Sequence, residues 1–566
     1  MHLNQPTLPD VDPDAFEAMS ERERVGLLSV DWTTNGFGAP VTAYAFYVIK
    51  IAGYVALWVF FVSRASGIAG WSDIGDWWAT PLAFQKAIVW TLVFEVLGFG
   101  CGSGPLTGRY IPPIVAFTHF ARPGTIRLPA FPDRVPLTAG DRRHAFDVAL
   151  YLAIVILAFR ALLSPDTLSL DELLPLIVLL PLIGLRDKTV FLAARSEHYW
   201  PLLIVFAFAL DGSRIDVAVL WGGAMVVQWA IWWGAAASKL NHHFPSVVAI
   251  MVSNSPWLRS ERLLKRMYRD HPVDLRPSTI PTWLAHGGTA IEFVFPLILV
   301  TTDGGLLTTI ALVVMFSFHL FITSNFPMGV PLEWNVVFVY SMFVLFGAHP
   351  EFSPFDAFNE PLLGLLLVAG ILVGPVYGSI RPDKISFLPS MRYYAGNWAA
   401  SLWLIRPEFE ETFDEKVIKT APNLRAQIVR LYDDHTANLL QARVRAFRSM
   451  HLHGRALNAL LNDVVDDVDD WLTFDGEGSA GIALGWNFGD GHLHHEQLLA
   501  ALQARCGFEP DQLRIVYLES QPFHRPWCEW RYVDAAAGEL DRGRVHVADL
   551  LDHQPWPEPG AINLRR

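Results

Sequence analysis

The chain has 566 residues, of which 52% are hydrophobic, including 21 Trp and 37 Phe. This composition is typical of a protein that crosses a membrane several times, and it excludes an ordinary soluble domain. The net charge is −13, and no basic face is concentrated enough to indicate a nucleic-acid partner.

The polar N-terminal segment, residues 1–40, has no basic start followed by an apolar stretch, so no cleavable signal peptide is expected. Apolar stretches then predict ten transmembrane spans, most of them near the length of about 20 residues that a bilayer requires, with a shorter fourth at residues 173–185. They cover residues 41–62, 81–100, 145–163, 173–185, 188–210, 217–238, 282–300, 305–323, 331–348 and 361–380. Lys and Arg crowd alternate loops, which by the positive-inside rule places both termini in the cytoplasm.

Beyond the last span, residues 381–406 are rich in Tyr and Trp and are expected to lie along the membrane surface. Residues 407–566 are expected to form a cytoplasmic domain. Its predicted elements are a long amphipathic helix over 409–451, strands at 482–488, 513–518 and 530–533, and a helix at 496–505. The predicted fold is therefore an all-α polytopic membrane bundle of about ten transmembrane helices, residues 41–380, with a small C-terminal α+β domain.

Ionisable side chains inside spans are costly and usually face the interior of a bundle. Lys50 and Glu95 are single charges at similar depth in the first two spans, which predicts an ion pair between them. Other polar groups favour the cytoplasmic half of their spans, which predicts a cavity open toward that leaflet. They are His198, Lys239, His286, Glu292, His319, Glu333 and Asn335.

Lys239 ends a run of 22 residues without an ionisable group, residues 217–238. It has two interpretations. The amine can snorkel to the lipid headgroups, or it can be a desolvated amine that acts as a base near neutral pH. Trp233 lies in the last turns of the same span and is a candidate ligand contact.

Histidines outside the spans carry no recognisable metal motif. His242 and His243 follow Lys239 closely and are candidate ligand contacts or headgroup contacts, but they lack a HExxH pattern. The histidines of the tail, including His451, His453, His492 and His494, show no ligand spacing and are expected at the surface or in loops. Cys101, Cys506 and Cys528 match no disulfide, zinc or redox pattern. No metal site is predicted.

Residues 186–346 contain several landmarks in order. They are Asp187-Lys188-Thr189 leading to His198, the segment WWGAAASKL ending at Lys239 and Leu240, His286-Gly287-Gly288 followed by Glu292, and Phe318-His319 before an aromatic span. This region resembles the vitamin K-dependent gamma-carboxylase and its bacterial relatives, the horizontally transferred transmembrane domain (HTTM) superfamily. The whole chain also resembles an uncharacterised family of actinobacterial integral membrane proteins.

The resemblance implies a bacterial plasma-membrane protein that binds menaquinone or another quinone. It implies that Lys239 is the catalytic base, that His286 and His319 are catalytic, and that His198 lines the cavity. The sequence departs from the family in lacking its large luminal peptide-binding domain, so carboxylation of a peptide is not expected. The alternative is a non-enzymatic protein that binds membrane lipids and recruits a cytoplasmic protein partner through its C-terminal domain.

Overall fold

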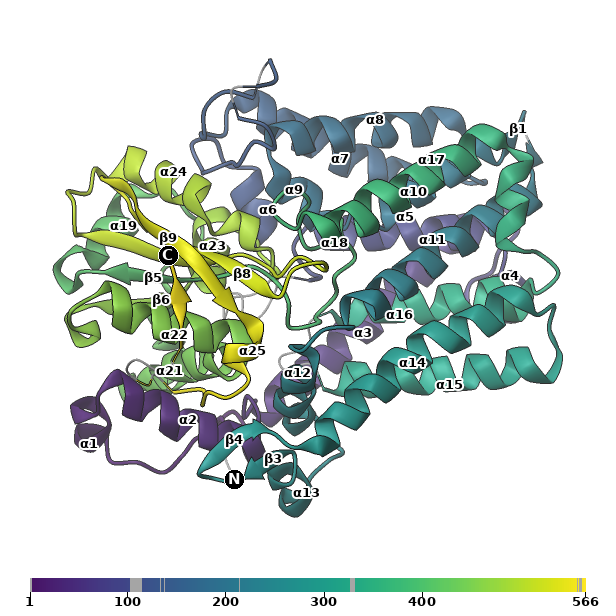
Figure 1. The fold of residues 1–566 in the computed structure, drawn as a ribbon. Helices are drawn as coiled ribbons and strands as arrows, with labels where there is room; N and C mark the ends of the chain where they lie inside the picture. Colours follow the sequence, from purple (N-terminus) through teal and green to yellow (C-terminus); the bar gives the residue numbers. More distant parts are fainter. Residues whose placement is uncertain are drawn as a thin grey trace.

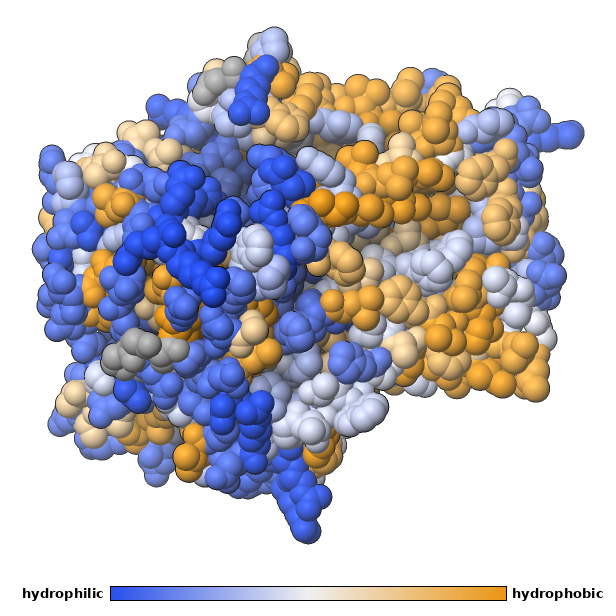
Figure 2. All heavy atoms as spheres, viewed as in Figure 1, coloured by the Kyte–Doolittle hydropathy of each residue, from blue (hydrophilic) through white to orange (hydrophobic). Residues whose placement is uncertain are grey.

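The computed structural model describes residues 3–101, 115–132, 134–136, 138–212, 214–325, 331–556, 558 and 562–566. It has two parts, a bundle of long helices and a C-terminal region built on a β-sheet, and they lie side by side in Figure 1. On the face drawn in Figure 2, hydrophobic side chains cover much of the bundle, whereas most of the C-terminal region is covered by hydrophilic side chains. An apolar outer surface is what the hydrocarbon of a bilayer requires of a helical bundle.

Six helical segments among the described residues are long and apolar enough to cross a membrane. Each has 18 to 23 residues, and a helix rises 1.5 Å per residue, so each approaches or exceeds the hydrocarbon thickness of about 30 Å. They are α3 (Val41–Val62), α7 (Ala145–Leu162), α11 (Val217–Ser238), α14 (Thr279–Thr301), α15 (Gly305–Ser324) and Pro361–Ile380, which begins with α17 (Pro361–Ile371) and ends with α18 (Gly378–Ile380).

The other four predicted spans correspond to shorter helices, so the count of ten stays a prediction. They are α5 (Pro81–Val96), α8 (Leu170–Arg186), α10 (Tyr199–Phe208) and α16 (Leu332–Met342). The predicted span over 188–210 is not continuous: α9 (Lys188–Ala193) ends before α10 begins. Arg195, in the break, has a φ of 48°, which is outside the helical region.

The N-terminal segment packs on the C-terminal region. It forms α1 (Pro13–Ala18) and α2 (Glu21–Asn35), and Ser20 and Glu23 build a capping box at the start of α2. The buried Arg443 of α21 (Asp434–Met450) forms an ion pair with Asp31 of α2. Both ends of the chain therefore lie at the same end of the bundle.

A six-stranded antiparallel sheet forms the core of the C-terminal region, in the order β10-β9-β8-β7-β5-β6. The strands are β5 (Ala400–Ile405), β6 (Leu472–Asp475), β7 (Leu513–Leu518), β8 (Trp527–Asp534), β9 (Gly538–His546) and β10 (Leu564–Arg565). The helices are α19 (Glu410–Lys416), α20 (Leu424–Ile428), α21, α22 (Leu452–Val464), α23 (Gly476–Leu484), α24 (Glu496–Cys506) and α25 (Val547–Leu550). The predicted α+β character of this region is confirmed.

Four predictions for this region are wrong. His453 lies neither at the surface nor in a loop, because it is buried within helix α22. Residues 400–405 do not lie along the membrane surface, because they form β5, a fully buried strand paired with β6 and β7. Residues 482–484 belong to helix α23, whose start is capped by the side chain of Asp475. The long helix predicted over 409–451 is divided into α19, α20 and α21, and Pro422 lies in the first break, where it disfavours a continuous helix.

Shorter elements connect the larger ones. They are α4 (Ile74–Trp77), α6 (Val115–Phe120), α12 (Phe244–Met251), α13 (Glu261–Lys265), and the hairpins formed by β1 (Leu210–Asp211) with β2 (Arg214–Ile215) and by β3 (Tyr268–Asp270) with β4 (Asp274–Pro277). Of these, α12 packs against α14 and contributes to the site described below.

The predicted ion pair between Lys50 and Glu95 is wrong. Lys50 Nζ lies 3.0 Å from Glu333 Oε2 on α16, and both side chains are buried. Glu95 instead accepts a hydrogen bond of 2.7 Å from the backbone N–H of Cys101. Similar positions within two predicted spans indicate that two side chains lie at a similar depth in the bundle. They do not indicate which faces of the helices contact each other.

Replacing Lys50 with Met is expected to lower the free energy of unfolding by about 3–5 kcal/mol, because Glu333 would be left buried without its cation. The double variant Lys50→Met/Glu333→Gln should recover much of this loss. Thermal unfolding of the purified protein in detergent measures both effects. A double variant as unstable as the sum of the two single variants would show that the two groups do not interact.

Candidate functional site

A largely apolar cavity of about 610 Å³ lies between α11, α12, α14, α15 and α16. Its wall is made mostly of aliphatic and aromatic side chains, among them Ile231, Val247 and Phe338. The polar side chains at its wall include Arg195, Lys239, Glu292, Ser317, His319, Asn325 and Asn335. The predicted polar groups Lys239, Glu292, His319 and Asn335 therefore meet in one cavity.

Lys239 and Glu292 form an ion pair at the cavity wall. Lys239 caps the C-terminal end of α11, and Glu292 lies in the middle of α14. The ammonium contacts both carboxylate oxygens, and both side chains are buried. The ring of Phe244, at the start of α12, lies 5.5 Å from the Lys239 nitrogen. The amine is therefore directed into the protein, and not toward lipid headgroups as the snorkelling interpretation requires.

His319 is held by hydrogen bonds at both ring nitrogens. The indole N–H of Trp232 donates to Nε2 at 3.0 Å, and Nδ1 lies 3.1 Å from Asn335 Oδ1. Because an indole nitrogen only donates, Nε2 is the acceptor, and Nδ1 carries the proton that Asn335 accepts. The amide nitrogen of Asn335 in turn donates to the carbonyl of Pro331 at 3.0 Å. These contacts fix the tautomer and the orientation of the imidazole.

Arg195 lies at the cavity wall, near Phe488 of the C-terminal region. Its guanidinium lies 2.6 Å from Glu197, 4.7 Å from the ring of Trp334 and 5.3 Å from the ring of Tyr393. The indole of Trp334 also donates to Nδ1 of the buried His198 at 3.1 Å. His198 therefore supports the wall through Trp334.

Four further predicted residues lie outside this cavity. Trp233 donates to the backbone carbonyl of Phe293 at 3.2 Å. The side chains of His242 and His286 are exposed. His243 is buried, but it contacts His453 and Gln521 of the C-terminal region.

Several wall residues were not among the predicted site residues. Arg195 was visible in the sequence as a charge within an apolar stretch, but its role at the cavity was not predicted. Trp232 and Trp334 could not be told from ordinary core tryptophans. Tyr393 is far along the chain from Lys239, and no local pattern places it at the cavity.

The fold and the cavity together define a polytopic integral membrane protein with a buried polar site next to a C-terminal sheet region. Residues 1–565 match the family described as transmembrane proteins of unknown function (DUF3556), and the chain belongs to that family. No curated protein and no solved structure matches the chain. The family that matches is not the gamma-carboxylase family, so the resemblance of residues 186–346 to carboxylases stays a hypothesis.

Proposed function

We propose that this protein is a membrane enzyme that binds a lipophilic molecule with an ionisable hydroxyl group, such as menaquinol or another hydroquinone. Lys239 removes the hydroxyl proton, which prepares the bound molecule for oxidation by dioxygen, the electron acceptor in this proposal. The observation that carries this proposal is the Lys239–Glu292 pair at the wall of a large apolar cavity.

The size and lining of the cavity support a lipophilic ligand. Small-molecule sites typically have volumes of about 300–1,000 Å³ and apolar walls with a few convergent polar groups. The cavity of about 610 Å³ has this character. In the proposed complex, the hydroxyl group of a ring contacts Lys239, and a hydrocarbon tail lies along the apolar wall.

The Lys239–Glu292 pair supports proton transfer. In water an amine is a stronger base than a carboxylate by about six orders of magnitude, so an amine is the better acceptor for a weakly acidic hydroxyl group. When Glu292 takes the extra proton of Lys239, the amine becomes neutral, and two buried charges are removed together. The neutral amine then accepts the hydroxyl proton, and the resulting ammonium stabilises the anion of the ligand.

The proposed location is a bacterial plasma membrane, with ten spans and both termini in the cytoplasm. The alternating Lys and Arg content of the loops supports this orientation. The contact of Asp31 with Arg443 also supports it, because it brings the N-terminal segment and the C-terminal region to one side. The C-terminal region is the surface available to a cytoplasmic protein partner.

We expect a hydroquinone or quinone to co-purify with the native protein. In His319→Ala its amount should fall about tenfold or more, because the support for Trp232 and Asn335 is lost. His286→Ala is the matched control, since its side chain is exposed, and it should retain the ligand. Mass spectrometry of the extracted lipid measures these amounts in protein checked for folding by thermal unfolding. Phospholipid alone in all three proteins would contradict the proposal and support the non-enzymatic lipid-binding alternative.

A further inference from the structure

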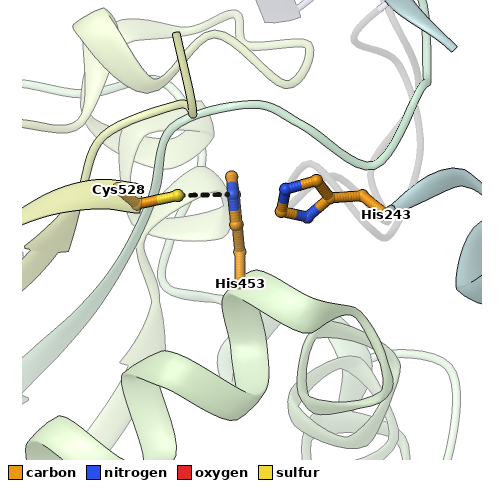
Figure 3. A group of neighbouring side chains, drawn as sticks. All are labelled: His243, His453 and Cys528. Atoms are coloured by element: carbon orange, nitrogen blue, oxygen red, sulfur yellow. Dashed lines mark hydrogen bonds between the residues drawn. The ribbon is translucent and has the colours of Figure 1, made fainter. Parts of the chain in front are cut away.

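Two histidines and a cysteine meet outside the cavity, where the loop after α11 touches the C-terminal region. His243 precedes α12, His453 lies in the first turn of α22, and Cys528 lies on β8. All three side chains are buried, and one potential ligand atom of each lies within 4.8 Å of the others. Figure 3 shows the two imidazoles and the cysteine sulfur approaching one another from three separate segments.

We propose that His243, His453 and Cys528 bind one transition-metal cation, with zinc the expected ion. Such a site would join the membrane bundle to the C-terminal region. It goes beyond the function proposed above, because none of the three side chains lines the cavity.

The hydrogen bonds of His453 prepare it as a ligand. Its Nδ1 contacts the backbone carbonyl of Trp398. A carbonyl only accepts, so Nδ1 carries the proton, and Nε2 has a free lone pair directed at Cys528 Sγ, 3.6 Å away. Metal-bound histidines typically donate their second ring N–H to a carbonyl or carboxylate in this way.

Cys528 and His243 supply the other two donors. In the metal-free protein the thiol of Cys528 can donate to Nε2 of His453. A bound cation would take the place of that proton, which would leave to solvent. The Nε2 atom of His243 lies 3.1 Å from Gln521 Oε1, whereas its Nδ1 is buried without a hydrogen-bond partner in the described part of the chain. The two imidazoles pack edge to face, with ring centroids 4.6 Å apart.

The types of ligand atom and the distance between them favour zinc or copper over calcium and magnesium. Bonds of about 2.0–2.3 Å in a tetrahedral zinc site separate neighbouring ligand atoms by about 3.5 Å, close to the 3.6 Å between Cys528 Sγ and His453 Nε2. Two imidazoles and a thiolate are ligands of zinc and copper, whereas calcium and magnesium prefer oxygen. Gln521 Oε1 is an oxygen donor available for a fourth position.

Cobalt binding tests this site in the purified full-length protein in detergent. After treatment with a chelator, Co²⁺ is added and the absorption spectrum is recorded, because a cobalt–thiolate bond gives a charge-transfer band. We expect one equivalent per chain in the native protein, displaced by Zn²⁺. Cys528→Ser should lose the band, and His453→Gln should bind at least tenfold more weakly. Elemental analysis of the protein as purified distinguishes zinc from copper.

Cys506→Ser is the matched control, because Cys506 is also a buried thiol but lies on α24, away from this cluster, and it should keep the band. If Cys528→Ser does not fold, His243→Gln tests the same cluster from the side of the membrane bundle and should also weaken binding at least tenfold. Absence of the band in the native protein, or its persistence in Cys528→Ser, would overturn the proposal.

Discussion

Replacing Lys239 with Arg is expected to lower the turnover of a bound hydroquinone by at least about 100-fold, while the protein folds and keeps its ligand. A guanidinium can preserve the ion pair with Glu292, but it cannot lose its proton at any accessible pH and so cannot act as a base. Oxygen consumption by the purified protein supplied with a short-chain hydroquinone measures turnover.

Two further variants test whether the loss of turnover comes from the missing amine of Lys239. Lys239→Ala should regain some turnover when a small amine is added, because the amine can occupy the space of the missing side chain. Lys265→Met removes the cation of an exposed Lys–Glu pair on α13, with a separation of 2.9 Å, and should leave turnover unchanged. Full activity in Lys239→Arg would show that Lys239 is not the base and that its role is limited to the ion pair with Glu292.

Replacing Arg195 with Met is expected to lower the free energy of unfolding by about 3–5 kcal/mol, the typical loss when one partner of a buried ion pair is removed. Glu197, 2.6 Å from the guanidinium, would remain buried without its cation. The contacts of the cation with the rings of Trp334 and Tyr393 would also be lost, so ligand retention should fall as well.

The double variant Arg195→Met/Glu197→Gln should recover part of the stability, because the unpaired charge is then removed. Arg64→Met is the control, since Arg64 is an exposed arginine that contacts an aromatic ring, Phe60, without an ion pair among the described residues. Thermal and denaturant unfolding in detergent measure all three variants. A loss in Arg195→Met no larger than in Arg64→Met would contradict the structural role assigned to Arg195.

The elements that follow from local patterns were predictable from the sequence. The strand predicted at 513–518 is β7, with the same bounds, and the helix predicted at 496–505 is α24, one residue longer. The first and sixth predicted spans are α3 and α11, again with the same bounds. In each case hydrophobic periodicity or an uninterrupted apolar run determines the structure within one segment.

Elements that depend on distant partners were not predictable. Residues 400–405 have the composition of an interfacial segment, but β6 and β7, which pair with them, begin much later in the chain. The partner of Lys50 could not be predicted for the same reason. Glu95 and Glu333 are both carboxylates at a suitable depth, and Lys50 pairs with Glu333. The choice between them depends on how the helices are rotated and packed.

Four polar members of the candidate site, Lys239, Glu292, His319 and Asn335, were predictable from the sequence, but their contacts were not. Lys239 and Glu292 were both identified as polar groups of a cavity, yet no spacing indicates that they pair across 53 residues. His286 and Glu292 are on the same helix six residues apart, which at about 100° per residue directs them to different faces. The structure places only Glu292 at the cavity.

In the proposed complex the cavity binds a hydroxylated lipophilic ring, and Lys239 takes its proton. The most direct test is the absorption spectrum of a short-chain naphthohydroquinone bound to the purified protein without oxygen, because the anion absorbs at longer wavelength than the neutral molecule. We predict the spectrum of the anion with the native protein and that of the neutral molecule with Lys239→Arg. A bound hydroquinone that stays neutral in the native protein would contradict the claim.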